Sequence, residues 1–222
     1  MSKPYDLLIF DWDGTLSDSA QVIVDSMQGA IAALKLPPRE DHQIRELIGL
    51  SLGDGMRRLY PEAAPGEVMS LLESYRRQWL GPSGGGANEA PLFAGTETVL
   101  EQLHGVGYGL TVATGKSRPG LDRSLRRHAG IKPLFLLTKT ADETAAKPDP
   151  LMLRETLAEL GVPAERALMI GDTEYDAAMA AAIGMPALGV ACGVHDHGRI
   201  RAAGAMAVID SVRDLPDWLA AR

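Results

Sequence analysis

Short, almost continuously apolar runs recur along the chain and limit its possible folds more than any other feature. They occupy residues 5–10, 110–113, 134–137, 167–170 and 187–191. Runs of this length without polar alternation are typical of strands that are buried on both faces of a parallel sheet. Amphipathic patterns separate them and indicate helices, such as 149–160, which Gly161 ends, and a second helix that Thr96 is expected to cap. This alternation predicts an α/β fold with right-handed crossovers.

The segment after the first run breaks the alternation. Residues 19–79 show only helical patterns, with two apolar stripes at helical spacing and no convincing strand. The glycine-rich stretch 82–88 then reads as a flexible linker. We therefore expect residues 1–15 and 89–222 to form a sheet-containing core, and residues 16–88 to form a helical domain inserted after the first strand.

Composition narrows the class of protein. Of the 222 residues, 45% are hydrophobic and 23% are charged, which is typical of a globular chain. The formal net charge of -7 disfavours nucleic acid as a partner, because that needs a basic surface. The single cysteine, Cys192, excludes an intramolecular disulfide and a multi-cysteine zinc site. Since we find neither a membrane-length apolar stretch nor a signal-peptide pattern, we expect a cytoplasmic monomer or small homo-oligomer with no membrane partner.

Two aspartates follow the first apolar run. Asp11 and Asp13 lie two residues apart on an extended chain, so both carboxylates can face one site, and Gly14 allows a sharp turn after them. Two close carboxylates repel each other unless a cation or a shared proton offsets them. A turn with solvated aspartates, or part of a calcium loop, would show the same pattern, so this pair alone does not decide the chemistry.

Two further clusters carry cations. Thr114, Gly115 and Lys116 follow the second run, and a hydroxyl, glycine amides and a cation together suit a phosphoryl oxygen. Lys147 precedes Pro148, which restricts the lysine backbone to extended conformations and so favours a fixed direction for its side chain. Each cluster in isolation fits equally well an ordinary strand-to-helix turn or an exposed lysine before a helix.

The fourth cluster is acidic. Asp172 and Asp176 are four residues apart, so at the start of a helix they share a face, and such oxygen ligands suit magnesium. Capping aspartates are the alternative reading. Ligands of parallel sheets gather at the carboxyl ends of the strands, and all four clusters are expected there. Their combination therefore predicts one site.

The motifs Asp-x-Asp-Gly-Thr, a later Thr, Lys-Pro and Gly-Asp-Thr-x-x-x-Asp, in this order, resemble those of the haloacid dehalogenase superfamily over nearly the whole chain. Within it, the chain is similar to the phosphoglycolate phosphatase-like branch. The resemblance implies a Rossmann-like parallel sheet with helices on both faces and an inserted all-helical cap. It also implies a magnesium-dependent phosphatase that hydrolyses a small phosphate monoester, with phosphoglycolate as the favoured guess, through an aspartyl phosphate.

The resemblance further implies roles for single residues. Asp11 would be the nucleophile and Asp13 the general acid and base. Thr114, the amide of Gly115 and Lys147 would hold the phosphoryl group.

The same resemblance implies a magnesium site. Its ligands would be Asp11, the backbone carbonyl of Asp13 and Asp172, and Asp176 would support them. Lys116 would be a possible substrate contact.

Alternatives remain open on the same core. One is a β-phosphoglucomutase-like phosphomutase, which would need several basic residues in the cap, whereas segment 45–52 offers only Arg45 followed by mainly apolar residues. Arg45 is therefore the candidate in the inserted domain for contacting a substrate anion. Nucleotide or pyrophosphate hydrolysis is another alternative. A binding module without turnover is the third, and the loss of Asp13 or Asp172 would have favoured it.

Three histidine or arginine clusters suggest no chemistry by themselves. His195 and His197 have no partner cluster that would make a metal site. The pairs 57–58 and 76–77, each Arg-Arg, are expected on solvated helix faces.

Overall fold

Six parallel strands form the centre of the structure, a computed structural model that describes residues 3–81 and 89–222. Their order across the sheet is β3-β2-β1-β4-β5-β6. The strands are β1 (Leu7–Phe10), β2 (Gly109–Thr114), β3 (Phe135–Thr140), β4 (Ala167–Gly171), β5 (Ala187–Val190) and β6 (Ala207–Ile209). The parallel registers confirm the α/β fold class, and β1 and β4 lie at the middle of the sheet.

Alternate residues of each central strand enter two separate cores. In β1, Leu8 and Phe10 face one core, while Leu7 and Ile9 face the other, because side chains of a strand point to opposite faces. The first core is covered by α5 (Thr96–Gly105), α6 (Arg118–Arg127) and α10 (Leu215–Ala220). The second core is covered by α7 (Leu151–Leu160), α8 (Glu174–Ala181) and α9 (His197–Ala202). Each fully buried aliphatic side chain stabilises the fold by roughly 1.5–3 kcal/mol.

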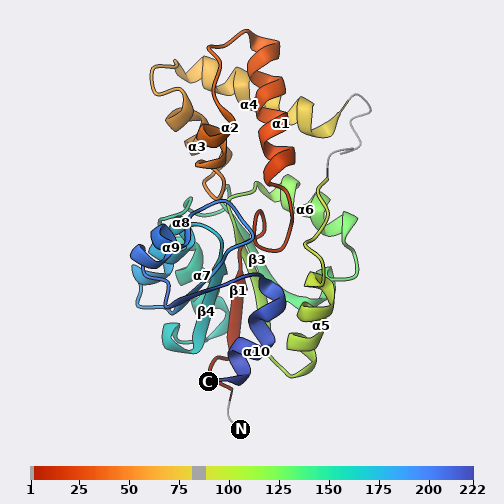
Figure 1. Cartoon of the computed structure of the whole chain (residues 1–222), viewed down its shortest axis with the longest axis vertical. Coiled ribbons are helices and arrows are strands. Elements are labelled where there is room, and N and C mark those ends of the chain that lie inside the picture. Colours follow the sequence, from red (N-terminus) through yellow and green to blue (C-terminus); the bar gives the residue numbers. More distant parts are fainter. Residues whose placement is uncertain (1–2, 82–88) are drawn as a thin grey trace.

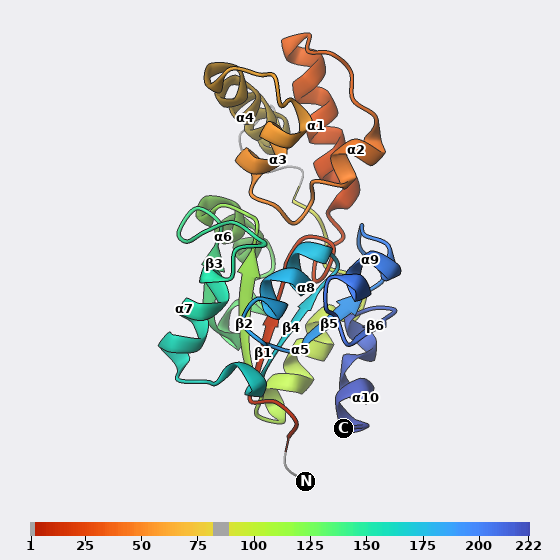
Figure 2. The same cartoon turned by 90° about the vertical axis from the view of Figure 1, so that its left-hand side faces the viewer.

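Four of the five described helices between β1 and β2 pack against one another and not into the sheet cores. They are α1 (Ala20–Leu34), α2 (Asp41–Arg45), α3 (Leu52–Leu59) and α4 (Pro65–Leu80), and they share a third apolar cluster. We call α1–α4 the helical unit. It stands at the carboxyl ends of the strands, and the first described residues and the C-terminus lie at the opposite end of the molecule (Figures 1 and 2). The ends of the strands therefore meet the helical unit at a common junction.

The structure corrects several details of the sequence analysis. The third strand begins after a short 3-10 turn, Lys132–Leu134. It lies at the edge of the sheet and is not buried on both faces, since the side chain of Leu136 is 62% exposed. The edge strand β6 was missed because it has only three residues. Gly95, not Thr96, is the N-cap of α5, and the Thr96 hydroxyl donates to the Leu16 carbonyl at 3.4 Å.

Two further expectations concern the linker and membrane-spanning helices. The predicted linker 82–88 lies outside the described residues. Within residues 3–81 and 89–222, none of the helices combines the length and the apolar character that crossing a bilayer needs.

Candidate active site

Lys147 joins two of the predicted acidic residues at the strand ends. Its Nζ lies 2.8 Å from Oδ1 of Asp11, which follows β1, and 2.6 Å from Oδ1 of Asp176 in the first turn of α8. Burial by itself would lower the pKa of Lys147, but the Asp11 and Asp176 carboxylates outweigh it and raise that pKa. The buried lysine therefore keeps its positive charge beside Asp11.

Asp11 is buried without a hydrogen bond of good geometry to either carboxylate oxygen from any described residue. Burial raises the pKa of Asp11 to about 7, although Lys147 acts in the opposite direction. A buried carboxylate with unsatisfied oxygens needs a further cation or a bound ligand to offset its desolvation. Lys147 pairs with Oδ1 at 2.8 Å, and the geometry leaves Oδ2 available for such a group.

Asp11, Asp172 and Asp176 together fit a divalent cation. Each offers one oxygen, and these oxygens lie within 4.8 Å of one another among buried residues. Burial, followed by repulsion from Asp11 and Asp176, raises the pKa of Asp172 well above its usual range. Three crowded hard-oxygen donors of like charge suit magnesium. Asp176 is the least available of the three, because its Oδ1 pairs with Lys147 and its Oδ2 accepts from the Thr173 hydroxyl at 2.7 Å.

Asp172 is oriented from two sides by groups that the sequence analysis did not assign. The Thr15 hydroxyl donates to its Oδ1 at 2.9 Å, and the Val194 amide donates to its Oδ2 at 3.0 Å. Gly14 makes this approach possible, because a Cβ there would lie 2.3 Å from Oδ2 and its φ of 79° also disfavours other residues. Thr15 belongs to the first motif and could have been suspected, whereas a backbone donor such as Val194 leaves no signal in the sequence.

Asp13 pairs with a different lysine from Asp11. Lys116 Nζ is 2.9 Å from its Oδ1, and the Ser19 hydroxyl, at the start of α1, donates to the same oxygen at 2.6 Å. The Lys116 amine also lies 4.8 Å from the centre of the Trp79 ring. Lys116 therefore contacts Asp13 directly. Ser19 was missed, because a serine before a helix is expected to be only a cap.

Gly115 lets the helical unit come close to the end of β2. A Cβ there would lie 2.6 and 2.5 Å from the carbonyl oxygens of Gly49 and Leu50, which precede α3. The Lys116 amide donates to the Thr114 hydroxyl at 3.3 Å, so Thr114 lies at the same turn. The segment of the helical unit before α3 thus covers the strand ends.

A cavity of about 90 Å³ lies under this cover. Asp11, Asp13, Thr114, Gly115 and Lys116 line it from the core side, and the helical unit lines it with mainly apolar residues. The structure thus brings the first two predicted clusters into one cavity, with Lys147 and the acidic cluster in contact with Asp11.

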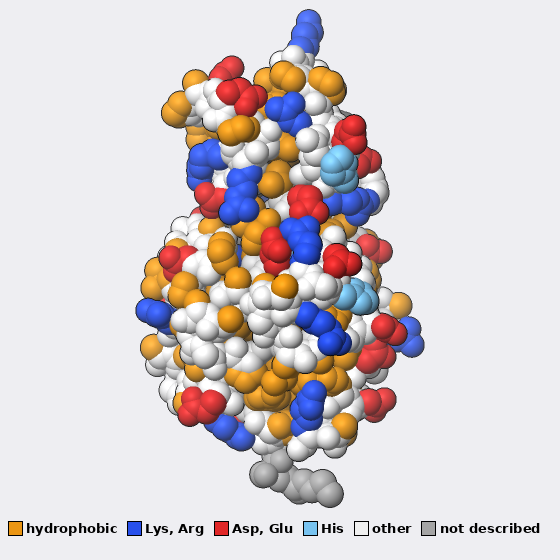
Figure 3. Space-filling model, turned by 60° about the vertical axis from the view of Figure 1, so that its left-hand side comes forward, with side chains coloured by type: hydrophobic (Ala, Val, Ile, Leu, Met, Phe, Trp, Pro, Cys, Tyr) orange, Lys and Arg blue, Asp and Glu red, His pale blue; other side chains and the backbone are white. Residues whose placement is uncertain are grey.

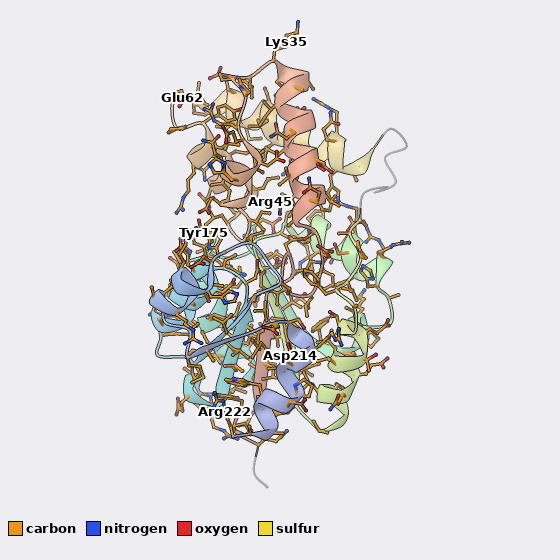
Figure 4. All side chains as sticks on the ribbon, viewed as in Figure 1. Lys35, Arg45, Glu62, Tyr175, Asp214 and Arg222 are labelled. Atoms are coloured by element: carbon orange, nitrogen blue, oxygen red, sulfur yellow. The ribbon has the colours of Figure 1, made fainter. Side chains whose placement is uncertain are left out.

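The two remaining expectations concern residues outside this cavity. Figure 4 labels Arg45 near the junction of the helical unit with the core. Arg45 donates to the Gln21 side chain and, among the described residues, is not part of the cavity lining. Its role as a substrate contact stays a prediction. His195 is buried, and its Nδ1 accepts from the Glu174 amide at 3.2 Å. Within the described residues neither His195 nor His197 belongs to a potential metal cluster.

Known proteins are similar to this chain in sequence and in fold. The sequence pattern of haloacid dehalogenase-like hydrolases matches residues 8–190. The probable phosphatase IndB of Dickeya dadantii is 33% identical over 214 residues, which cover 94% of this chain and 91% of that protein. A phosphoglycolate phosphatase of Rhodospirillum rubrum is 30% identical over 222 residues, covering 96% and 90%. The crystal structure of a hydrolase from Pseudomonas syringae superimposes with a TM-score of 0.86 at 25% identity, covering 97% and 98%.

These matches span nearly the whole chain, and they agree with the strand order and with the gathering of the aspartates at the strand ends. They confirm the resemblance drawn from the motifs, and with it the class of phosphoric monoester hydrolases. The chain belongs to the haloacid dehalogenase-like hydrolases and is a phosphatase of that family.

Proposed function

We propose that this phosphatase depends on magnesium and hydrolyses a small phosphate monoester through a phosphorylated Asp11. The observation that carries the proposal is the state of Asp11, which is buried with Lys147 Nζ 2.8 Å from its Oδ1 and with Oδ2 unpartnered among the described residues. The names of the relatives make phosphoglycolate the first substrate to test. The expected cytoplasmic location is part of this proposal.

In the first half-reaction an oxygen of Asp11 attacks phosphorus, and the bond between phosphorus and the ester oxygen breaks. Lys147 offsets the negative charge of the nucleophile and of the phosphoryl oxygens, while the hydroxyl of Thr114 and the amide of Gly115 hold the phosphoryl group. Asp13, which lines the same cavity as Asp11, donates its proton to the departing alkoxide. Magnesium, when held by Asp11, Asp172 and the carbonyl of Asp13, would add positive charge where two anions meet.

In the second half-reaction Asp13, now ionised, takes a proton from water as the water attacks the phosphoryl group on Asp11. Phosphate leaves, and Asp11 and Asp13 return to their starting states. Lys116 and Ser19 both contact Oδ1 of Asp13, so they orient the carboxyl group for both proton transfers. Dividing the reaction in this way replaces one difficult displacement by two easier ones.

We further propose that residues 16–88 act as a cap domain that excludes bulk water and selects the leaving group. The close contact of Gly49 and Leu50 with Gly115 supports this role, because the helical unit there lies against the end of β2.

Phosphoryl trapping combined with product analysis tests the proposal. Acid quenching during turnover should yield a phosphorylated protein that hydroxylamine cleaves, and Asp11→Asn should not form it. Turnover in oxygen-18 water should put one label into each released phosphate. Interconverted sugar phosphates with little free phosphate would identify a phosphomutase instead. Absence of the acyl phosphate in an active enzyme would reject Asp11 as nucleophile.

A further inference from the structure

A second and larger cavity adjoins the catalytic one. Its volume is about 640 Å³, against about 90 Å³ for the cavity at Asp11. Four residues line both: Ser51, Leu52, Gly115 and Lys116. The larger cavity extends from them between α4 of the helical unit and α6 of the core, which lies beneath it (Figures 1 and 2). An ester whose phosphoryl group occupies the small cavity can therefore extend its leaving group into the large one.

One wall of the large cavity is apolar. Leu72, Tyr75 and Trp79 of α4 line it. The orientation of Trp79 is fixed, because its indole N–H donates to Glu89 at 3.0 Å and Glu89 also accepts from the Ser124 hydroxyl of α6 at 2.8 Å. An ordered apolar wall favours a leaving group with an apolar body.

The charge of the large cavity is positive although the chain is acidic. Its lining includes three basic residues, Arg76, Lys116 and Arg123. Among the described residues that line it, only Asp142 is acidic. The Asp142 carboxylate already accepts from the Arg118 amide at 2.8 Å and from the Thr140 hydroxyl at 2.7 Å. A cationic cavity in a chain of net charge -7 favours an anionic occupant.

The three cations differ in what they already bind. Lys116 pairs with Asp13 at 2.9 Å, and Arg123 lies 3.4 Å from Glu89. Arg76 is exposed and has no ion-pair partner within residues 3–81 and 89–222. Arg76 is therefore the cation that remains available to a ligand.

We propose that the large cavity binds the leaving group of the substrate, and that this group combines an apolar body with an anionic substituent that pairs with Arg76. The inference rests on the proposed phosphatase function and names its substrate class. Pockets of about 300–1,000 Å³ hold ligands much larger than a two-carbon acid. Phosphoglycolate would therefore leave most of the 640 Å³ unfilled and is not the substrate that this cavity fits.

Three esters with alkoxide leaving groups test the inference: phosphoglycolate, benzyl phosphate and 4-carboxybenzyl phosphate. For the wild-type enzyme with magnesium, kcat/KM should be highest for 4-carboxybenzyl phosphate, by about tenfold or more over benzyl phosphate, which lacks the anion. A preference for phosphoglycolate over both benzyl esters would overturn the proposal.

A cavity-filling variant tests the location. Gly120 lines the cavity from α6, and a Cβ there would meet Ser117 Oγ at 3.4 Å and Arg123 Nη2 at 3.9 Å, which are ordinary contacts. Gly120→Leu should lower kcat/KM for both benzyl esters at least about tenfold more than for phosphoglycolate. Gly105→Leu, at the exposed end of α5 with open space around it, is the matched control. Equal effects of Gly120→Leu on all three esters would overturn the location.

A charge variant tests the anion. Arg76→Gln should lower kcat/KM for 4-carboxybenzyl phosphate about tenfold. It should change kcat/KM for benzyl phosphate less than about twofold, because that ester lacks the anion. Arg77 is the neighbouring exposed cation and is not among the described residues that line the cavity. Arg77→Gln should therefore leave kcat/KM unchanged for both benzyl esters. Equal losses on the two benzyl esters would remove Arg76 from anion recognition.

Binding separates failure of this inference from failure of the proposed function. 4-Carboxybenzyl phosphate should bind Asp11→Asn in the presence of magnesium, and adding Gly120→Leu should weaken its Kd at least about tenfold. If none of the three esters is hydrolysed but this weakening is seen, the phosphatase mechanism is wrong and the cavity assignment holds. If the esters are hydrolysed and Gly120→Leu leaves Kd unchanged, the cavity assignment is wrong.

Discussion

Arg199 of α9 binds Glu46 of the helical unit through both carboxylate oxygens, which lie 2.8 and 2.6 Å from its Nη1. The same guanidinium donates to the Glu174 carboxylate from Nη2 at 2.8 Å. The Tyr175 hydroxyl adds a hydrogen bond of 2.9 Å to the Glu46 carbonyl. Acidic and basic side chains adjoin one another over this part of the junction (Figure 3). These contacts connect the helical unit to the core on a side away from the large cavity between α4 and α6.

Glu46→Gln is expected to loosen the junction without unfolding the protein. The pair is partly exposed, with side chains 36% and 47% accessible, so it contributes about 0.2–1 kcal/mol. Closure of the helical unit should therefore weaken by up to about fivefold, raising KM by that factor at low salt and less at high salt. Glu62→Gln, which breaks a pair with Arg39 inside the helical unit, should leave KM unchanged. A KM shift of equal size in both variants would contradict a specific role for Glu46.

Asp11→Asn is expected to abolish turnover and to preserve the fold. An amide of nearly the same shape is a poor nucleophile, and the loss should reach about 10⁴-fold or more, as for other nucleophile replacements. Lys147 keeps Asp176 as its partner in the variant, so the buried lysine is not left unpaired. Phosphate release measures the activity, and circular dichroism with thermal unfolding measures the fold. Activity close to that of the wild type, in protein free of wild-type contamination, would reject the mechanism.

The main features of the fold and site could be predicted because each depends on a local pattern. An apolar run identifies a buried strand, and the polar residue at or just after its end, such as Asp11, Thr114 or Asp172, lies at the carboxyl end of that strand. Parallel packing then brings those ends together, whatever the length of chain between them.

Contacts between distant segments could not be predicted in this way. The link from Thr15 to Asp172 depends on the final positions of two segments and not on spacing. Ser19 lies only six residues after Asp13, but their contact depends on the path of the turn between β1 and α1. The same holds for the approach of Leu50 to Gly115, which decides how the helical unit sits over the site. Arg76 looked like one of two equivalent surface arginines until the structure placed it, and not Arg77, in a cavity wall.

Removal of divalent cations is expected to stop turnover. Excess chelator should abolish phosphate release, magnesium should restore it, and calcium should inhibit, because it favours a looser and higher coordination. Magnesium should also raise Tm, since a ligand that binds only the folded state stabilises it. Full activity in excess chelator would reject the metal site.

Thr15→Val is expected to weaken that site without removing a ligand. The substitution deletes the hydroxyl that donates to Asp172 Oδ1 at 2.9 Å, so the carboxylate loses one of its two orienting contacts. Losses of this kind lower metal affinity by about 10–100-fold. The magnesium concentration for half-maximal activity should rise accordingly, while excess magnesium should recover much of the rate. A variant with unchanged magnesium dependence would show that Thr15 does not position Asp172.

His195 is expected to make the protein less stable as the pH falls. Its Nδ1 accepts from the Glu174 amide at 3.2 Å, so this nitrogen carries no proton in the folded state. Its Nε2 is buried without a partner among the described residues. Its ring lies edge-on to the Tyr175 ring, with 5.1 Å between the two ring centroids. Burial, and then the nearby charge of Arg199, lower the pKa of His195 despite the opposite effects of Glu46 and Glu174.

The sign of the effect follows from linkage. An unfolded histidine takes up its proton near pH 6.5, above the lowered pKa of folded His195, so the unfolded state binds more protons between these two values. The contribution of neutral His195 is therefore fully present above about pH 6.5 and is lost as the pH falls toward the folded pKa. Between about pH 8 and pH 5.5, Tm should fall further for the wild type than for His195→Gln. The glutamine amide oxygen can still accept from the backbone amide of Glu174. His197→Gln, at an exposed histidine two positions on, should behave like the wild type. Equal decreases in Tm for the wild type and His195→Gln would show that other groups, and not His195, cause the acid sensitivity.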